Sequence, residues 1–281
     1  MDTPLSDTKI PSVGCAHPTL FMGSGTPRGM GNGYIFLVLA LTFFPFGSLA
    51  QGEGLSAHQV LSYAEGHFLK LATLQGTVQR LISRDKRRAS YTYRFSYQKP
   101  DKFRIEYLRP FQGQIVSNGQ FYWEYRPSRR QMVKRELSSL SEEEKRGLGI
   151  TPGFGLDLVA KVPAARYDYR LEGQEGGNYL VIATPKPGEA TLTRKEILVE
   201  SKRWVVLAFR HYSGEGKLIA QADFSDHRAL PRGIWLPLRI TTRVLPENYV
   251  ESLSYSGLKV NALLPEGLFT FQAPPGAQSV P

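Results

Sequence analysis

Cysteine is nearly absent from this chain: its 281 residues include one, Cys15. No disulfide can form within the chain, and no cysteine-based metal site is available. The absence does not exclude an oxidising compartment, since a core can hold itself together by packing alone.

Long tracts of one charge are also missing, although the net charge is +10. The basic residues are spread over many predicted strands, which argues against nucleic acid as a partner. An anionic membrane surface, acidic partners and a merely soluble basic surface stay open.

Catalytic motifs are missing as well. The sequence contains no nucleophile motif, phosphate-binding loop or zinc-binding pattern. The densest acid–histidine cluster is "DFSDH", residues 223–227, whose side chains could bind a metal, but a solvated turn explains them more simply. We therefore expect no enzyme, no cofactor and no metal. A hydrolase with dispersed catalytic residues is kept as an alternative, because such residues escape a motif search.

The first fifty residues resemble a secretory leader. An apolar core runs from Tyr34 to Phe46, and Ser48-Leu49-Ala50 supplies small residues before Gln51. A bilayer span needs roughly 20 apolar residues, so this core is short for a membrane anchor, which is the alternative. Met22 offers a second start that gives a shorter leader. We predict a signal peptide over residues 1–50 and a domain over residues 51–281 that works in the periplasm. No cysteine follows the core, so no lipid anchor is expected.

The exported part begins with a helix and continues as strands. Residues Leu55 to Leu71 carry apolar side chains at helical spacing, and Ser56 is a suitable N-cap. Beyond them the hydrophobic pattern has a period of two through about a dozen segments separated by short turns. The residues from Ser138 to Val162 interrupt this pattern with short-helix signatures. Serial antiparallel strands form a meander, which curls into a barrel or half-barrel.

Aromatic residues are concentrated in "YQKPDKFRIEYLRPFQGQIVSNGQFYWEYRP", residues 97–127. Asn118-Gly119 is the residue pair that a type I′ hairpin turn prefers. In a curved sheet, a face lined with aromatic side chains forms a hydrophobic core where helices cover it fully. The same face forms a cavity where helices cover it only in part. An acyl chain entering such a cavity gains about 0.8 kcal/mol per buried methylene. An alternating aromatic residue is more often part of a core than of a ligand site, and the pattern alone does not decide between them here.

The same stretch resembles the signature of the periplasmic outer-membrane lipoprotein carriers, the LolA type. The elements that carry the resemblance are Lys99-Pro100, Phe103, "IVSNG" and "FYWEYRP". The leading helix followed by "LQGTVQ" and the closing "GLFTFQAPPGAQSV" also fit. "GIWLPLRITTRV" is similar to the wider set of LolA-like lipoprotein-sorting proteins.

The resemblance implies a mainly β fold: an open, unclosed antiparallel β-barrel with the N-terminal helix and a short helical insertion as a lid over a hydrophobic cavity. In the family, an arginine before the proline hydrogen-bonds the lid. Lys99 stands there in this chain and is our candidate for a lid latch, although lysine lacks the planar fork of arginine. Phe103 matches a cavity aromatic. By alternation we extend this lipid-binding face to five more residues: Ile105, Tyr107, Phe121, Trp123 and Tyr125.

The resemblance also implies a function. We expect a monomeric, non-enzymatic periplasmic carrier that holds the acyl chains of lipoproteins. It would receive them from an inner-membrane ABC exporter and pass them to an outer-membrane acceptor. The alternatives are a LolA-like carrier of free lipid or glycolipid, a lipid sensor of envelope stress, and a scaffold whose aromatic face is only core.

Overall fold

A computed structural model describes residues 54–140, 166–189 and 192–280. The predicted leader, its cleavage site and most of the predicted helical insertion lie outside these ranges. Within them the fold consists of one α-helix, α1 (Ala57–Leu69), three short 3₁₀ turns and fourteen strands. The strands are β1 (Thr73–Arg84), β2 (Arg87–Gln98), β3 (Lys102–Arg109), β4 (Gly113–Asn118), β5 (Phe121–Arg126), β6 (Gln131–Glu136), β7 (Tyr167–Glu175), β8 (Asn178–Pro185), β9 (Lys195–Glu200), β10 (Val205–Tyr212), β11 (Leu218–Leu230), β12 (Ile234–Val244), β13 (Tyr249–Val260) and β14 (Gln278–Val280).

Helix α1 begins where the sequence predicts. The Gln59 N–H donates to the Ser56 hydroxyl at 3.2 Å, and the Gln59 side chain accepts from the Ser56 N–H at 2.8 Å. This reciprocal capping box satisfies two donors that the first turn would otherwise leave open. The helix then buries a stripe at helical spacing, formed by Ala57, Val60, Leu61, Ala64 and His67. The predicted helix is therefore confirmed, with ends two residues shorter than expected.

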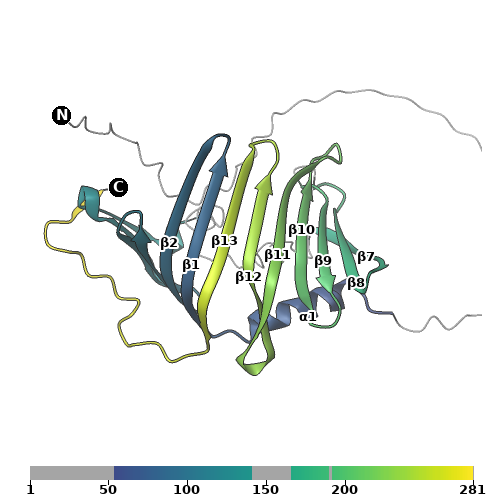
Figure 1. Ribbon diagram of the computed structural model, residues 1–281, viewed down its shortest axis with the longest axis horizontal. Coiled ribbons are helices and arrows are strands. Elements are labelled where there is room, and N and C mark those ends of the chain that lie inside the picture. Colours follow the sequence, from purple (N-terminus) through teal and green to yellow (C-terminus); the bar gives the residue numbers. More distant parts are fainter. Residues whose placement is uncertain (1–53, 141–165, 190–191, 281) are drawn as a thin grey trace, which may run out of the picture.

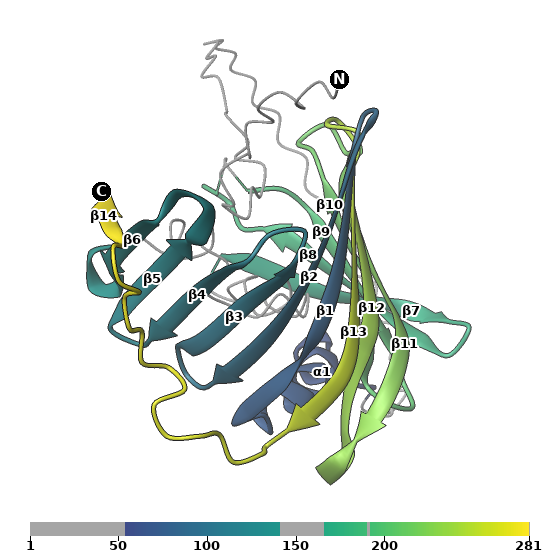
Figure 2. The same ribbon diagram turned by 60° about the vertical axis from the view of Figure 1, so that its left-hand side comes forward.

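All described strands belong to one curved sheet that does not close. Its order is β14-β6-β5-β4-β3-β2-β1-β13-β12-β11-β10-β9-β8-β7, so β14 and β7 are its edges. The chain thus forms two antiparallel meanders, β1–β6 and β7–β13, which meet where β1 pairs with β13. Figures 1 and 2 show the sheet as an open trough, with α1 on its concave side. The prediction of an unclosed, mainly β fold is confirmed.

The one parallel pairing among the described strands lies at an edge. Residues 261–277 leave β13, and β14 then pairs in parallel with β6. Figure 2 shows this C-terminal segment running along the outside of the sheet from the end of β13 to β6. The predicted open antiparallel barrel is confirmed, and the short β14 adds one parallel pairing at its edge, since a long return segment can bring a strand alongside β6 in either direction.

The main hydrophobic core lies between α1 and the concave face. Its buried side chains come from α1 and from strands on both sides of the β1–β13 junction, and α1 makes its main contacts with β7, β8, β9 and β12. A second, smaller cluster lies on β3–β5 and just after β6. It consists of Phe103, Ile115, Tyr122 and Leu137, with Tyr97, Ile105, Tyr107 and Leu140 packed around them.

Candidate functional site

A run of aromatic side chains lines the concave face over β2, β3 and the loop after β3. The ring centroids of Tyr93 and Tyr107 are 5.5 Å apart, and those of Tyr107 and Phe111 are 5.3 Å apart. The Phe111 ring also lies 5.8 Å from that of Tyr91. All four side chains are half-buried, and they lie outside the main contacts of α1. We call Tyr91, Tyr93, Tyr107 and Phe111 the aromatic ladder.

Three of the predicted lipid-binding residues share the face of this ladder. Phe103, Ile105 and Tyr107 alternate along β3 and pair with Tyr97, Phe95 and Tyr93 of β2, respectively. Ile105 and Tyr107 are half-buried, whereas Phe103 is only 3% exposed and packs on Tyr122 with the ring centroids 6.3 Å apart. Ile105 and Tyr107 thus remain accessible, and Phe103 is part of the second core.

The predicted extension of this face across the hairpin was wrong. Ser117, on the face of Phe103, pairs with Tyr122, so the concave face continues to Tyr122. Phe121, Trp123 and Tyr125 therefore lie on the convex face. A two-residue loop joins residues i and i+3, and every further pair also differs by an odd number, so odd-numbered residues of β4 lie opposite even-numbered residues of β5.

The hairpin turn itself also differs from the expected one. The two loop residues are Gly119 and Gln120, not Asn118 and Gly119. Gly119 has a φ of +90°, whereas Gln120 is not among the positive-φ residues, so the loop is not the type I′ turn that needs both. Asn118 instead caps the loop, since its side-chain oxygen accepts from the N–H groups of Gln120 at 2.9 Å and Phe121 at 2.8 Å.

One of the convex-face aromatics, Trp123, packs against the C-terminal segment. The Trp123 and Phe271 rings are stacked, with centroids 5.8 Å apart and planes 14° apart. The Lys134 ammonium lies 4.0 Å from the Phe121 ring centroid. The Arg104 guanidinium donates to the Leu268 carbonyl at 3.3 Å. The Trp123–Phe271 stack and the Arg104 hydrogen bond help to hold the C-terminal segment on the outside of the sheet.

A polar groove of about 330 Å³ lies beside that segment on the convex face. Arg104 and Arg94 both pair with Glu106 there, at 2.8 Å and 3.3 Å. Lys259 and Leu268 also line this groove. Its charged lining suits water or a polar group and not an acyl chain.

Lys99 joins β2 to the end of α1. Its ammonium donates to the carbonyl of Phe68 at 2.5 Å and to that of Leu69 at 3.3 Å. Its backbone N–H donates to the Ala72 carbonyl at 2.9 Å. The last carbonyls of a helix lack intrahelical donors and carry partial negative charge, so a cation there is favourable. The candidate latch thus contacts the helix, from an exposed position.

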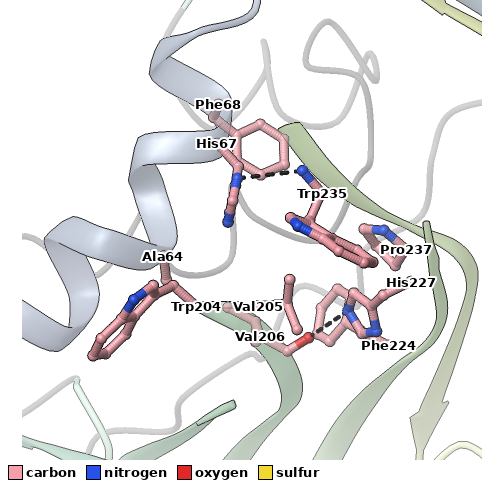
Figure 3. A pocket seen from close by; sticks show the side chains of 10 residues that line it. All are labelled: Ala64, His67, Phe68, Trp204, Val205, Val206, Phe224, His227, Trp235 and Pro237. Carbon is pink, nitrogen blue, oxygen red and sulfur yellow. Dashed lines mark hydrogen bonds between the residues drawn. The ribbon is translucent and has the colours of Figure 1, made fainter. Parts of the chain in front are cut away.

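A small hollow lies under the C-terminal half of α1 (Figure 3). His67 bridges its rim: Nδ1 accepts from the Trp235 N–H at 3.3 Å, and Nε2 therefore donates to the Arg203 carbonyl at 2.7 Å. Deeper in the hollow, His227 Nε2 donates to the Val206 carbonyl at 3.0 Å. Burial lowers the pKa of His227, so this imidazole stays neutral. The cavity volume of about 10 Å³ has room for roughly one water molecule, so this is a packing joint and not a ligand site.

The side chains of the acid–histidine cluster at residues 223–227 have separate partners. Asp223 forms an ion pair with Arg243, and the His227 imidazole points to Val206. Among the described residues no group of three or more His, Cys, Asp or Glu side chains could hold a metal ion. In the same part of the chain, no helix has the length and apolar character needed to cross a membrane.

Comparison with known proteins places this geometry in a family. A family model described as "-like: Uncharacterized protein" matches residues 114–273, more than half of the chain. The outer-membrane lipoprotein carrier protein of Albidiferax ferrireducens is 25% identical over 190 residues, which are 66% of this chain and 71% of the relative. The outer-membrane lipoprotein carrier protein of Leptothrix cholodnii is 25% identical over 212 residues, which are 75% of this chain and 92% of the relative. The chain belongs to the LolA-like family.

A solved structure supports the LolA-like fold. The LolA superfamily protein from Nitrosomonas europaea matches 78% of this chain and 99% of its own, with a TM-score of 0.52 and 19% identity. Identity at that level establishes the fold and no more. The structure thus agrees with the resemblance drawn from residues 97–127, although the family model begins only at residue 114.

Within this LolA-like trough, the reasoning from sequence missed part of the aromatic ladder as a site. Tyr91 and Tyr93 alternate on the same side of β2, which the period-two pattern already shows. Phe111 lies in the loop after β3, where no periodicity predicts the direction of a side chain. Only the pairing of β2 with β3 shows that these rings are neighbours of Tyr107.

Proposed function

We propose that this chain is a non-enzymatic carrier that holds acyl chains on the concave face of its trough. The observation that carries the proposal is the aromatic ladder, four half-buried rings in mutual contact that lie outside the main contacts of α1. Half-buried rings on a concave surface offer apolar area that a ligand can cover, at about 25 cal/mol per Å². The names of the two carrier relatives point to the same class of cargo.

We further propose that the carrier works in the periplasm. The sequence predicts export, and the relatives are outer-membrane lipoprotein carriers by name. The sequence shows no phosphate-binding loop, so energy for directed transfer would come from partners. Those partners are, by analogy with the family, an inner-membrane exporter and an outer-membrane acceptor. N-terminal sequencing of the exported protein should begin near Gln51, and recovery of the intact chain from the cytoplasm would contradict the location.

The test of acyl-chain binding compares two tyrosines on opposite faces. Tyr107→Glu places a charge in the ladder, and we expect the affinity for a fluorescent fatty acid to fall about tenfold or more, since a charge next to bound hydrocarbon is costly. Tyr125→Glu is the matched control, because Tyr125 is equally half-buried on the convex face. Phe103 is unsuitable, since a charge at a side chain only 3% exposed would unfold the chain.

The stability of both variants and the binding of the control variant check this comparison. Thermal unfolding of both variants should stay cooperative, and Tyr125→Glu should bind the probe as the wild type does. If the wild-type chain takes up no fatty acid and carries no lipid when purified from the periplasm, the carrier proposal is wrong. Mass spectrometry of copurified material would separate lipoprotein cargo from free lipid or glycolipid.

A further inference from the structure

Two leucines are presented to solvent at the end of α1, where β1 begins and β13 ends. Leu263 is 100% exposed and Leu69 is 75% exposed, the two highest values among the large apolar side chains of the described residues. Figures 1 and 2 show the start of β1 and the end of β13 side by side at the lower end of the sheet, with α1 next to them. One exposed leucine is ordinary, but two on adjoining segments form a local apolar surface. We call Leu69 and Leu263 the leucine tip.

Hydrogen bonds hold the two segments of the tip together. The Asn261 side chain donates to the Lys70 carbonyl at 2.9 Å, and the Asn261 N–H donates to the Thr73 carbonyl at 2.8 Å. The Thr73 hydroxyl in turn donates to the Ala262 carbonyl at 2.8 Å. Each leucine is adjacent in sequence to a residue of this network, since one precedes Lys70 and the other follows Ala262. The leucines are therefore displayed from backbone that is held in place on both segments.

The leucine tip is accompanied by lysines. Lys70 follows the first leucine directly, the Lys99 ammonium donates to that leucine's carbonyl at 3.3 Å, and Lys259 is exposed near the end of β13. The segments 69–73 and 259–266 contain one acidic residue, Glu266. Residues 100–102, which follow Lys99, add one acid and one base. The tip thus combines projecting apolar side chains with an excess of positive charge.

This combination suits a fluid anionic surface better than a shaped partner. A fully exposed side chain projects from the molecule, so a protein partner would have to supply a matching apolar pocket. A bilayer needs no such pocket, because lipids adapt to the side chains that enter them. Leucines beside lysines match the boundary between acyl chains and headgroups, where the leucines meet hydrocarbon and the lysines meet phosphates. The net charge of +10 has the sign that anionic lipids attract.

We propose that the leucine tip inserts into the surface of an anionic membrane, with Lys70, Lys99 and Lys259 against the lipid phosphates. Insertion would place the C-terminal end of α1 at the headgroups, because Leu69 is the last residue of that helix. This docking goes beyond the proposed carrier function and does not rest on it.

Flotation with two kinds of vesicle tests the docking: equal parts of phosphatidylglycerol and phosphatidylcholine, and phosphatidylcholine alone. Protein purified from the periplasm is used, since the predicted leader would bind lipid by itself. We expect binding to the anionic vesicles to be at least about tenfold tighter and to weaken as the salt concentration rises. Lys70→Gln and Lys259→Gln should each weaken it by about fivefold.

The double change Leu69→Ser and Leu263→Ser should lower the affinity for anionic vesicles by about tenfold or more, because it removes the apolar side chains that insert. Leu245→Ser is the matched control. Leu245 is 51% exposed and lies in the turn between β12 and β13, at the opposite end of these strands. Equal losses in the two variants, or no loss in either, would overturn the role of the tip.

A wild-type protein that does not float with anionic vesicles would overturn the docking proposal. A photocrosslinker at residue 263 that then captured a protein would assign the tip to a protein partner instead. Tyr107→Glu should float as the wild type does, and a loss there would show that the trough and not the tip holds the lipid. Uptake of a fluorescent fatty acid in solution tests the carrier function separately. The tip variants should retain that uptake, so either proposal can fail while the other stands.

Discussion

Single polar side chains, and not apolar area alone, fix α1 on the sheet. His67 is 9% exposed and uses both ring nitrogens, one toward β12 and one toward the turn before β10. The two bonds require a neutral ring with its proton on Nε2. A residue of the apolar stripe thus also sets the position of the helix, because its hydrogen bonds have direction and hydrophobic contact does not.

We predict that His67→Leu destabilises the chain by about 2–4 kcal/mol. The change keeps apolar bulk but leaves the Trp235 N–H and the Arg203 carbonyl unpaired, at about 1–3 kcal/mol for each buried group. Urea unfolding measures the difference. Ser62→Leu on the same helix is the control, since Ser62 is exposed and the change should alter stability by less than about 0.5 kcal/mol. Equal losses in the two variants would contradict the role of the bridge.

The helix as an element is tied at its C-terminal end and covers only part of the trough. Lys99 reaches its last carbonyls, and the main contacts of α1 are with β7, β8, β9 and β12. The main contacts of α1 therefore do not include the aromatic ladder on β2 and β3.

We predict that Lys99→Met loosens the last turn of α1 without unfolding the chain. Global stability should fall by about 1 kcal/mol or less, because the ammonium is exposed and screened by solvent. Amide hydrogen exchange at Leu69–Leu71 should become faster, and uptake of a fluorescent fatty acid should speed up. Lys102→Met, an exposed lysine on β3, provides the control. Unchanged exchange at the end of the helix would rule out Lys99 as a latch.

The whole molecule consists of two meanders joined at the β1–β13 pairing. Its free energy of unfolding should depend on pH through two buried histidines. Burial lowers the pKa of His211 to about 4 and also lowers that of His227. The unfolded chain, with histidine near 6.5, therefore binds these protons first as the pH falls. The contribution of these two histidines to the free energy of unfolding is therefore fully present above about pH 6.5. It is lost as the pH falls toward their pKa values in the folded chain.

We predict that the urea midpoint declines between pH 6.5 and 4.5, before most carboxylates titrate. His211→Asn should flatten that decline, because the variant has no proton to take up at this position. Glu189 and Glu200, whose pKa values are lowered, act at still lower pH, where protonation breaks their pairs with arginines. A midpoint independent of pH over this interval would show that the two histidines remain solvated in the native chain.

Local patterns predicted the elements well. The capping box and the apolar spacing of α1 lie within one stretch of chain, as does the alternation along β2 and β3. Relations between strands were less predictable. The faces of Phe121, Trp123 and Tyr125 depend on the number of loop residues, and the direction of β14 depends on a return path of many residues. The expected and the observed hairpin loops both have two residues, so the error lay in the parity of the pairing and not in the length of the loop.

The sequence by itself therefore determined one helix, a series of strands, an aromatic-rich first meander and the resemblance to the LolA-like family. Only the tertiary structure decided which rings share the concave face and where α1 packs. Hydrophobic periodicity acts between residues close in sequence, whereas a site in a curved sheet brings together residues from strands far apart in the chain. Their meeting is fixed by pairing register and sheet curvature, which no single stretch of sequence encodes.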